Sequence, residues 1–199
     1  MRIWYNNENH GGEPMRKNFG PKAWMYPQPV LIIATYNEDG SPNAMNAAWG
    51  CISDMNQIGI YISQTHKTAK NILHRKSFTV SMATADQMIP CDFVGVVSGN
   101  KDPEKFAKTG WHIHKSETVD APVIEELPMT LECRLVSVNE ESELVLGEIV
   151  NVCADECILT DGKIDPSKLR PISYDSCNHT YVVLGDKVGN AFKDGFSLK

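Results

Sequence analysis

The stretch VLIIATYNEDGSPNAMNAAWGCIS, residues 30–53, predicts two antiparallel strands joined by a tight turn. The run from Val30 to Tyr36 is apolar and rich in β-branched residues, as is typical of a buried strand. Asp39-Gly40 is a hairpin signal, and Pro42 can begin a returning strand although it could not lie within one. The returning strand is expected over residues 44–53. The stretch therefore indicates an antiparallel β protein.

The pattern of further elements supports a mainly β fold. Strands are expected over 57–63, 77–84, 129–139, 142–159 and 180–192, and helices over 66–76, 85–98 and 102–110. The last helix has Asp102 as its cap, Pro103 at its first position and Gly110 as its stop. Because strands outnumber helices and do not alternate with them, a barrel is favoured over a doubly wound parallel sheet.

One domain over residues 1–199 is expected from the chain length. Residues 1–25 form a Gly- and Pro-rich N-terminal arm, and residues 160–199 a C-terminal extension that begins with a polar, turn-rich segment. A net charge of −6 argues against a nucleic-acid-binding face. No apolar run approaches the ~20 residues of a membrane helix, and the polar start lacks a signal-peptide core, so a cytoplasmic protein is expected.

Six cysteines raise the question of disulfides or zinc. Disulfides are disfavoured in a chain of this length without an export signal. Cys153 and Cys157 lie four apart, but no paired C-x-x-C knuckles accompany them. Small buried or half-buried thiols are therefore expected, with Cys51 and Cys133 in the core.

The usual catalytic and nucleotide-binding motifs are absent from the sequence. There is no G-x-S-x-G elbow, no P-loop and no G-x-G-x-x-G fingerprint, and no histidine or carboxylate pair has a diagnostic spacing. GDKVGNAF, residues 185–192, is interpreted as a strand-ending turn. Catalytic side chains are therefore not assigned.

The segment SQTHKT, residues 63–68, combines hydroxyls with basic side chains where a strand gives way to a helix. A helix N-terminus attracts phosphate, and hydroxyls with a lysine on the same turn strengthen that attraction. The alternative is ordinary capping of the helix by Thr65 beside a solvated Lys67. The residues alone leave both interpretations open.

The segment NAMNAAW, residues 43–49, spaces Asn43, Asn46 and Trp49 three apart. On a strand, Asn43 and Asn46 would point to opposite faces. Backbone amides, an amide side chain and Trp49 would suit a flat heterocycle rimmed with acceptors. The alternative is that Trp49 is a core residue and the two asparagines lie at the ends of turns. This alternative is favoured when each residue is considered singly.

Several blocks in order resemble the flavin reductase-like proteins, and among them the flavoredoxins most closely. They are PVLIIATYNEDGSPNAMNAAWGCIS, IYISQTHKTAKNI, FTVSM, FVGVVSGNKDPEKFAKTGW and APVIEELPMTLECRLVSV, which run through about residues 20–138. The resemblance resumes more loosely at HTYVVLGDKVGNAF. It implies a split β-barrel of antiparallel, Greek-key-like strands with a few short helices. It also implies FMN binding by a homodimer with sites near the subunit interface.

The resemblance also implies roles for individual residues. The isoalloxazine ring would lie along Asn43, Asn46, Ala47, Ala48 and Trp49. The phosphate would be held by Ser63, Thr65, His66, Lys67 and Thr68, with the charge contact falling to either His66 or Lys67. The ribityl chain or phosphate would also be reached by Ser98, Gly99 and either Lys101 or Lys105. His179 or an aromatic side chain would approach the open face of the ring.

The implied activity follows from the cofactor. The chain is expected to be an NAD(P)H-dependent flavin oxidoreductase, in which NADH or NADPH supplies a hydride that is transferred through N5 of FMN. The alternative is a flavoredoxin-type electron carrier between protein partners that does not use NAD(P)H directly. A third possibility is a β-barrel binding module without redox activity, which the hydroxyl and lysine cluster disfavours.

Overall fold

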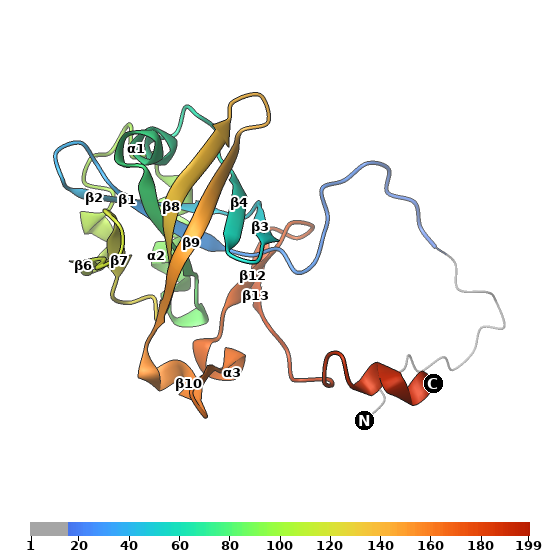
Figure 1. The fold of residues 1–199 in the computed structure, drawn as a ribbon. Helices are drawn as coiled ribbons and strands as arrows, with labels where there is room; N and C mark the ends of the chain where they lie inside the picture. The colour runs from blue at the N-terminus through green and yellow to red at the C-terminus, as the bar shows by residue number, and fades with distance from the viewer. Residues whose placement is uncertain (1–15) are drawn as a thin grey trace.

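The computed structural model describes residues 16–199, so the first 15 residues of the expected arm lie outside the described part. Its main strands are β1 (Leu31–Tyr36), β2 (Pro42–Ala47), β3 (Gly50–Asp54), β4 (Gln57–Tyr61), β5 (Ser77–Met82), β8 (Met129–Asn139) and β9 (Leu144–Ala154). They form one antiparallel seven-stranded sheet in the order β2-β1-β5-β8-β9-β4-β3. The sheet curls into a half-barrel, which confirms the mainly β split-barrel prediction (Figure 1).

Smaller elements surround this sheet. Three two-stranded pairs are formed by β6 (Ile113–Lys115) with β7 (Pro122–Ile124), β10 (Leu159–Thr160) with β11 (Lys163–Ile164), and β12 (Ile172–Asp175) with β13 (Thr180–Val183). The helices are α1 (Lys67–Arg75), α2 (Met88–Val96) and α3 (Pro166–Leu169). Short 3-10 turns lie at Ala85–Gln87, Ala107–Thr109, Glu156–Ile158 and Asp194–Leu198. No helix among residues 16–199 has the length and apolar character needed to cross a membrane.

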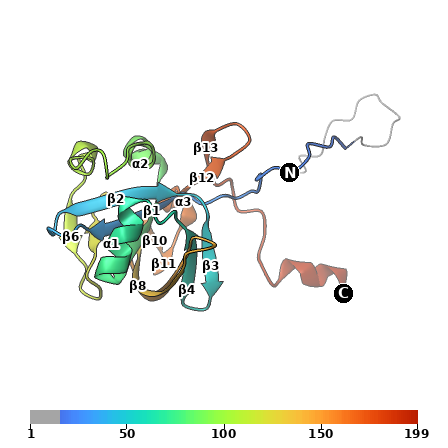
Figure 2. The ribbon, with the colours of Figure 1, turned by 90° about the horizontal axis from the view of Figure 1, so that it is seen from above.

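Two apolar cores lie on the two faces of β1 and β2. Leu31 and Ile33 pack inside the curled sheet with α1, whereas Ile32 and Ala34 pack on the other face with α2. Figure 2 shows α1 and α2 on opposite sides of β2. Burial on both faces explains why residues 30–36 read as a continuous apolar run rather than an alternating one.

The expected returning strand over 44–53 is two strands, not one. β2 lies at one edge of the sheet and β3 at the other, and Ala48 and Trp49 connect them outside either strand. At Gly50 an added Cβ would lie 2.8 Å from Leu31 Cδ1 and 3.1 Å from the Gly59 carbonyl oxygen, so a side chain there would crowd both. The chain thus crosses the split of the barrel, and the connecting residues are free to line a pocket there.

The helix expected over 102–110 is a series of turns that ends in the 3-10 turn Ala107–Thr109. Its end signals are present: Asp102 Oδ1 accepts from the Glu104 amide at 3.1 Å, and Gly110 has a φ of 73°. Two adjacent side chains, Lys105 and Phe106, are both buried. So short a segment gains little from α-helix formation, and tertiary burial decides its conformation.

The C-terminal part also departs from expectation. The hairpin at Asp161-Gly162 is present between β10 and β11, but the strand expected over 180–192 ends at Val183. Residues 122–124, for which no strand was expected, form β7. Residues 16–27 and 184–199 extend away from the barrel (Figure 1). Large apolar side chains on the latter segment are exposed, and they are Leu184, Val188, Phe192, Phe196 and Leu198.

Candidate functional site

Two adjoining pockets lie where β2 leaves the sheet and α1 begins. The small pocket has a volume of about 120 Å³, and the large pocket about 790 Å³. Met45 and His66 line both, so the two pockets share a wall. Binding pockets for small molecules measure roughly 300–1,000 Å³, so the large pocket can take a ring system and the small one only a compact group.

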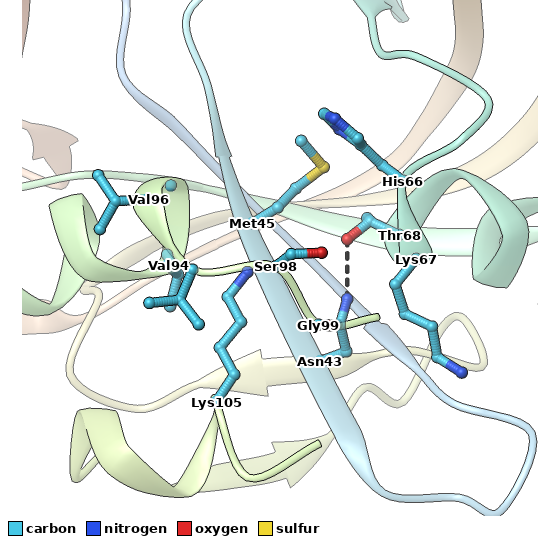
Figure 3. Close-up of a pocket in the computed structure, with 12 residues that line it drawn as sticks. Asn43, Met45, His66, Lys67, Thr68, Val94, Val96, Ser98, Gly99 and Lys105 are labelled. Carbon is cyan, nitrogen blue, oxygen red and sulfur yellow. Dashed lines mark hydrogen bonds between the residues drawn. The ribbon is translucent and has the colours of Figure 1, made fainter. Parts of the chain in front are cut away.

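The small pocket is enclosed by β2, the start of α1 and the segment that follows α2. Its polar walls include two buried side chains that hydrogen bond to each other: Asn43 Nδ2 donates to Thr68 Oγ1 at 2.8 Å (Figure 3). Gly99 contacts the same asparagine, because a Cβ there would lie 2.6 Å from Asn43 Oδ1. Two predicted segments, 43–49 and 63–68, are therefore joined directly.

The first turn of α1 opens beside the small pocket without a side-chain cap. His66 occupies the N-cap position and makes no capping hydrogen bond. Thr65 does not cap either, since its hydroxyl lies 3.1 Å from Ser63 Oγ. The capping interpretation of the hydroxyls is therefore wrong. The free amides of a helix N-terminus carry partial positive charge and favour an anion.

The lysines near the small pocket differ in where their ammonium groups lie. Lys105 is only 4% exposed and points into the pocket, whereas the end of Lys67 points away from it (Figure 3). Lys101 is exposed and lines neither pocket. Within residues 16–199, the Lys105 ammonium has no hydrogen-bond or ion-pair partner, and burial lowers its pKa to about 8.

The large pocket is mostly apolar and lies along the connection from β2 to β3. Ala47, Ala48 and Trp49 line it, as expected for a flat ligand. Trp49 is 61% exposed, so the interpretation of Trp49 as a core residue is wrong. Ser63 lines this pocket, whereas Thr65 lines neither.

Asn43 and Asn46 point to opposite faces of β2, as strand geometry predicts. Asn46 Nδ2 donates to the Cys91 carbonyl of α2 at 3.1 Å. Asn46 thus lines the large pocket and also a cavity of about 270 Å³ beside α2, which Tyr174 and Tyr181 line as well. The predicted residues therefore surround the pocket pair, apart from Thr65 and Lys101.

Some lining residues have no counterpart among the predicted ones. Met45 shares a face with Asn43 on β2, and strand alternation could have identified it. Met25, Tyr61 and Tyr174 reach the large pocket from distant segments, and no local pattern signals this. His179 lies outside both pockets, and its Nδ1 is 2.9 Å from the hydroxyl of Tyr174.

The cysteines only partly match the buried thiols that were expected. Cys91 and Cys133 are buried, and burial raises the pKa of each thiol to about 12. Cys51, expected in the core, is exposed and lines the large pocket, because β3 is an edge strand. Cys157 and Cys177 are exposed as well. Among residues 16–199, no three His, Cys, Asp or Glu side chains are grouped to hold a metal ion.

Comparison with known proteins identifies similar sequences and folds. The model of the family described as "Flavin reductase like domain" matches residues 24–168. Flavoredoxin of Desulfovibrio vulgaris (Miyazaki F) is 32% identical, with a TM-score of 0.86 over 91% of this chain and 100% of that chain. Flavoredoxin from Methanosarcina acetivorans is 27% identical, with a TM-score of 0.84 over 94% of this chain and 100% of that one.

A relative among curated sequences carries no assigned activity. The uncharacterized protein YddH of Escherichia coli (strain K12) is 27% identical over 169 residues, which cover 80% of this chain and 88% of that protein. An FMN-binding domain of a flavin reductase-like enzyme from Shewanella baltica has a TM-score of 0.74 at 20% identity, covering 82% of this chain and 89% of that one. That likeness concerns the fold alone.

Proposed function

This chain belongs to the flavin reductase like domain family, and we propose from that membership that it is an FMN-binding oxidoreductase reduced by NADH or NADPH. The observation that carries the proposal is the pair of adjoining pockets. An apolar pocket large enough for a ring system adjoins a compact pocket with a helix N-terminus and a buried lysine. FMN has the same division into a flat ring and a phosphate.

One structural feature, the position of Lys105, supports FMN binding independently of family membership. Lys105 is only 4% exposed, and its ammonium faces the small pocket without a partner among residues 16–199, an arrangement that a bound anion would stabilise. We place the phosphate near Lys105, Thr68 and Ser98 in the small pocket. We place the ring along Ala47–Trp49 in the large pocket, with Met45 and His66 between the two ends.

When bound, FMN supplies two-electron chemistry at its ring, and the protein's tasks are binding, orientation and exclusion of water. Backbone amides of the β2–β3 connection would face the polar edge of the ring, where donors stabilise negative charge. The exposed Trp49 would cover part of the apolar ring surface. None of these tasks needs a nucleophilic side chain.

We also propose that the protein is a homodimer. The support is the segment 184–199, whose large apolar side chains are exposed and whose path leads away from the barrel (Figure 1). A second copy would cover these side chains and the exposed mouth of the large pocket. A cytoplasmic location stays a prediction from the sequence.

One experiment separates the proposed oxidoreductase from the flavoredoxin-type carrier. The purified protein is saturated with FMN, and its absorbance is followed anaerobically on addition of NADH and then NADPH. Rapid bleaching by either nucleotide supports the oxidoreductase. Slow bleaching by both, with rapid reduction by a redox protein donor, supports the carrier. A protein that does not bind added FMN would overturn both, and only a binding module would remain.

A further inference from the structure

Lys105 and Lys67 line the same small pocket, but only Lys105 directs its ammonium group into it (Figure 3). The stem of Lys67 contacts Gly99, where an added Cβ would lie 3.5 Å from Lys67 Cβ. Its charged end lies toward a separate cavity of about 370 Å³ that Asp39 also lines. The pKa of Asp39 is lowered by its hydrogen bonds to Ser41 and also by the charge of Lys67.

Among residues 16–199, no carboxylate forms an ion pair with Lys105. Asp102, on the same segment, accepts from Lys108 Nζ at 2.6 Å and from the Glu104 amide. Asp39 accepts from the amide and hydroxyl of Ser41 at 2.9 and 2.6 Å. Lys105 therefore faces a polar pocket that has donors and a positive helix end but, among the described residues, no anion.

We propose that the small pocket binds the phosphate of FMN together with a proton, which is held on Lys105. This inference rests on the proposed function. In the free protein Lys105 exchanges its proton in a mildly alkaline range, because burial without an anion disfavours the ammonium form. A phosphate dianion beside it favours that form. Binding of the anion and of the proton are therefore coupled, and each strengthens the other.

Other titratable groups around Lys105 do not replace it in this role. In the small pocket, segment 94–99 and β2 contribute no titratable side chain, and the start of α1 contributes His66 and Lys67. The cavity of about 370 Å³, which Lys105 also lines, is bordered by Glu38 and Asp39 of the β1–β2 turn and by Asp102 of the lysine's own segment. An approaching anion raises the pKa of a carboxylate, but hydrogen bonds lower the pKa values of Asp39 and Asp102, so both stay ionised at pH 8 and 9. His66 lines the same small pocket as Lys105, so a variant at His66 is the required control.

Isothermal titration calorimetry measures this coupling directly. FMN is titrated into flavin-free protein at pH 8.0 and 9.0 in buffers of different ionisation enthalpy, and the slope gives the protons taken up. With the pKa of Lys105 at about 8, wild type takes up about half a proton at pH 8 and nearly one at pH 9. Phosphate monoesters are already dianions there, since their second pKa is about 6. Riboflavin, which has no phosphate, binds without uptake.

Four variants distinguish Lys105 from its neighbours. Lys105→Met abolishes uptake and lowers FMN affinity about tenfold to a hundredfold, the loss of one charge-assisted contact, while riboflavin affinity is kept. Lys105→Arg keeps the preference for FMN over riboflavin but loses the uptake, because arginine stays charged. Lys67→Met and His66→Gln both keep the uptake.

The outcomes separate this inference from the proposed function. Wild type that binds FMN without taking up protons at pH 8 and 9 overturns the inference and leaves the proposed function intact. So does uptake that persists in Lys105→Met or disappears in His66→Gln. Wild type that binds neither FMN nor riboflavin overturns the proposed function itself.

Discussion

At the scale of single residues, the sequence indicates which segments form the site but not which side chains enter it. Residues 43–49 and 63–68 were expected to bind one ligand, and the hydrogen bond from Asn43 to Thr68 joins them. The charge contact was expected from His66 or Lys67, with Lys101 or Lys105 also reaching the ribityl chain or phosphate. The ammonium that enters the small pocket belongs to Lys105, not to Lys67. Side-chain direction depends on packing around each residue, and spacing along the chain does not reveal it.

Trp49 gives a test of the ring position that leaves the fold intact. Its side chain is 61% exposed and lines the large pocket, so Trp49→Ala should change the free energy of unfolding by less than about 0.5 kcal/mol. Loss of a stacking surface should weaken both FMN and riboflavin by ~1–3 kcal/mol in a fluorescence titration. Met55→Ala, on an exposed residue outside the pockets, is the matched control. Equal affinities in Trp49→Ala and wild type would place the ring elsewhere.

Lys105 gives the flavin-free protein a pH-dependent stability. Its pKa is lowered to about 8 by burial, below the ordinary lysine value of 10.5, so the unfolded chain binds more protons between these values. The free energy of unfolding therefore rises as pH increases from about 8 to 10.5 through this group. Urea unfolding should show that rise in wild type and a smaller one in Lys105→Met. Lys101→Met, on an exposed lysine, should behave as wild type; identical pH profiles in all three would contradict the burial of an unpaired ammonium.

At the scale of elements, long apolar strands could be predicted from the sequence and short elements could not. The strand over 129–139 matches β8, and β1 lies within the expected 30–36. The prediction of a helix over 102–110 is wrong although the predicted end signals are present, because burial of Lys105 and Phe106 decides the local conformation. The prediction of a single strand over 44–53 is wrong, because a local sequence pattern cannot show that the chain passes from one edge of a sheet to the other.

Helix α1, which begins with the last two residues of the SQTHKT segment, ends at a residue with an unfavourable backbone conformation. Lys76 at its C-cap has a φ of 57°, a region that glycine occupies without steric cost. Lys76→Gly should therefore raise the free energy of unfolding by ~0.5–1 kcal/mol in urea titrations. Lys70→Gly, within the same helix and exposed, should lower it by about 1 kcal/mol. A destabilised Lys76→Gly would show that this helix end is held by contacts of the lysine side chain.

At the scale of the whole molecule, the split barrel and its family could be identified from ordered blocks of sequence. The complete lining of the site could not. Met25 and Tyr174 reach the large pocket from the N-terminal segment and from β12, and only the folded chain brings them together. Two hydrogen bonds between Gln28 and Ser173, at 3.0 and 2.9 Å, fix these distant segments against each other.

The segment 184–199 predicts the oligomeric state. Val188 and Phe192 are fully exposed, and a second copy that covers them would give a particle of twice the chain mass of 22.2 kDa. Light scattering coupled to size exclusion should show that dimer for the full chain. A variant that ends at Leu184 should shift toward the monomer, because it loses the apolar side chains of the segment. A Lys187→Ser variant, which keeps those side chains, should remain dimeric; a monomeric full chain would contradict the assignment.

The most direct test of the central claim is a crystal structure of the protein with FMN. We expect the phosphate in the small pocket, within hydrogen-bond distance of Lys105 Nζ and beside the first turn of α1. We expect the ring in the large pocket, along Ala47–Trp49. Electron density for FMN with its phosphate against Lys67 and its ring away from Trp49, or no density at saturating FMN, would contradict it.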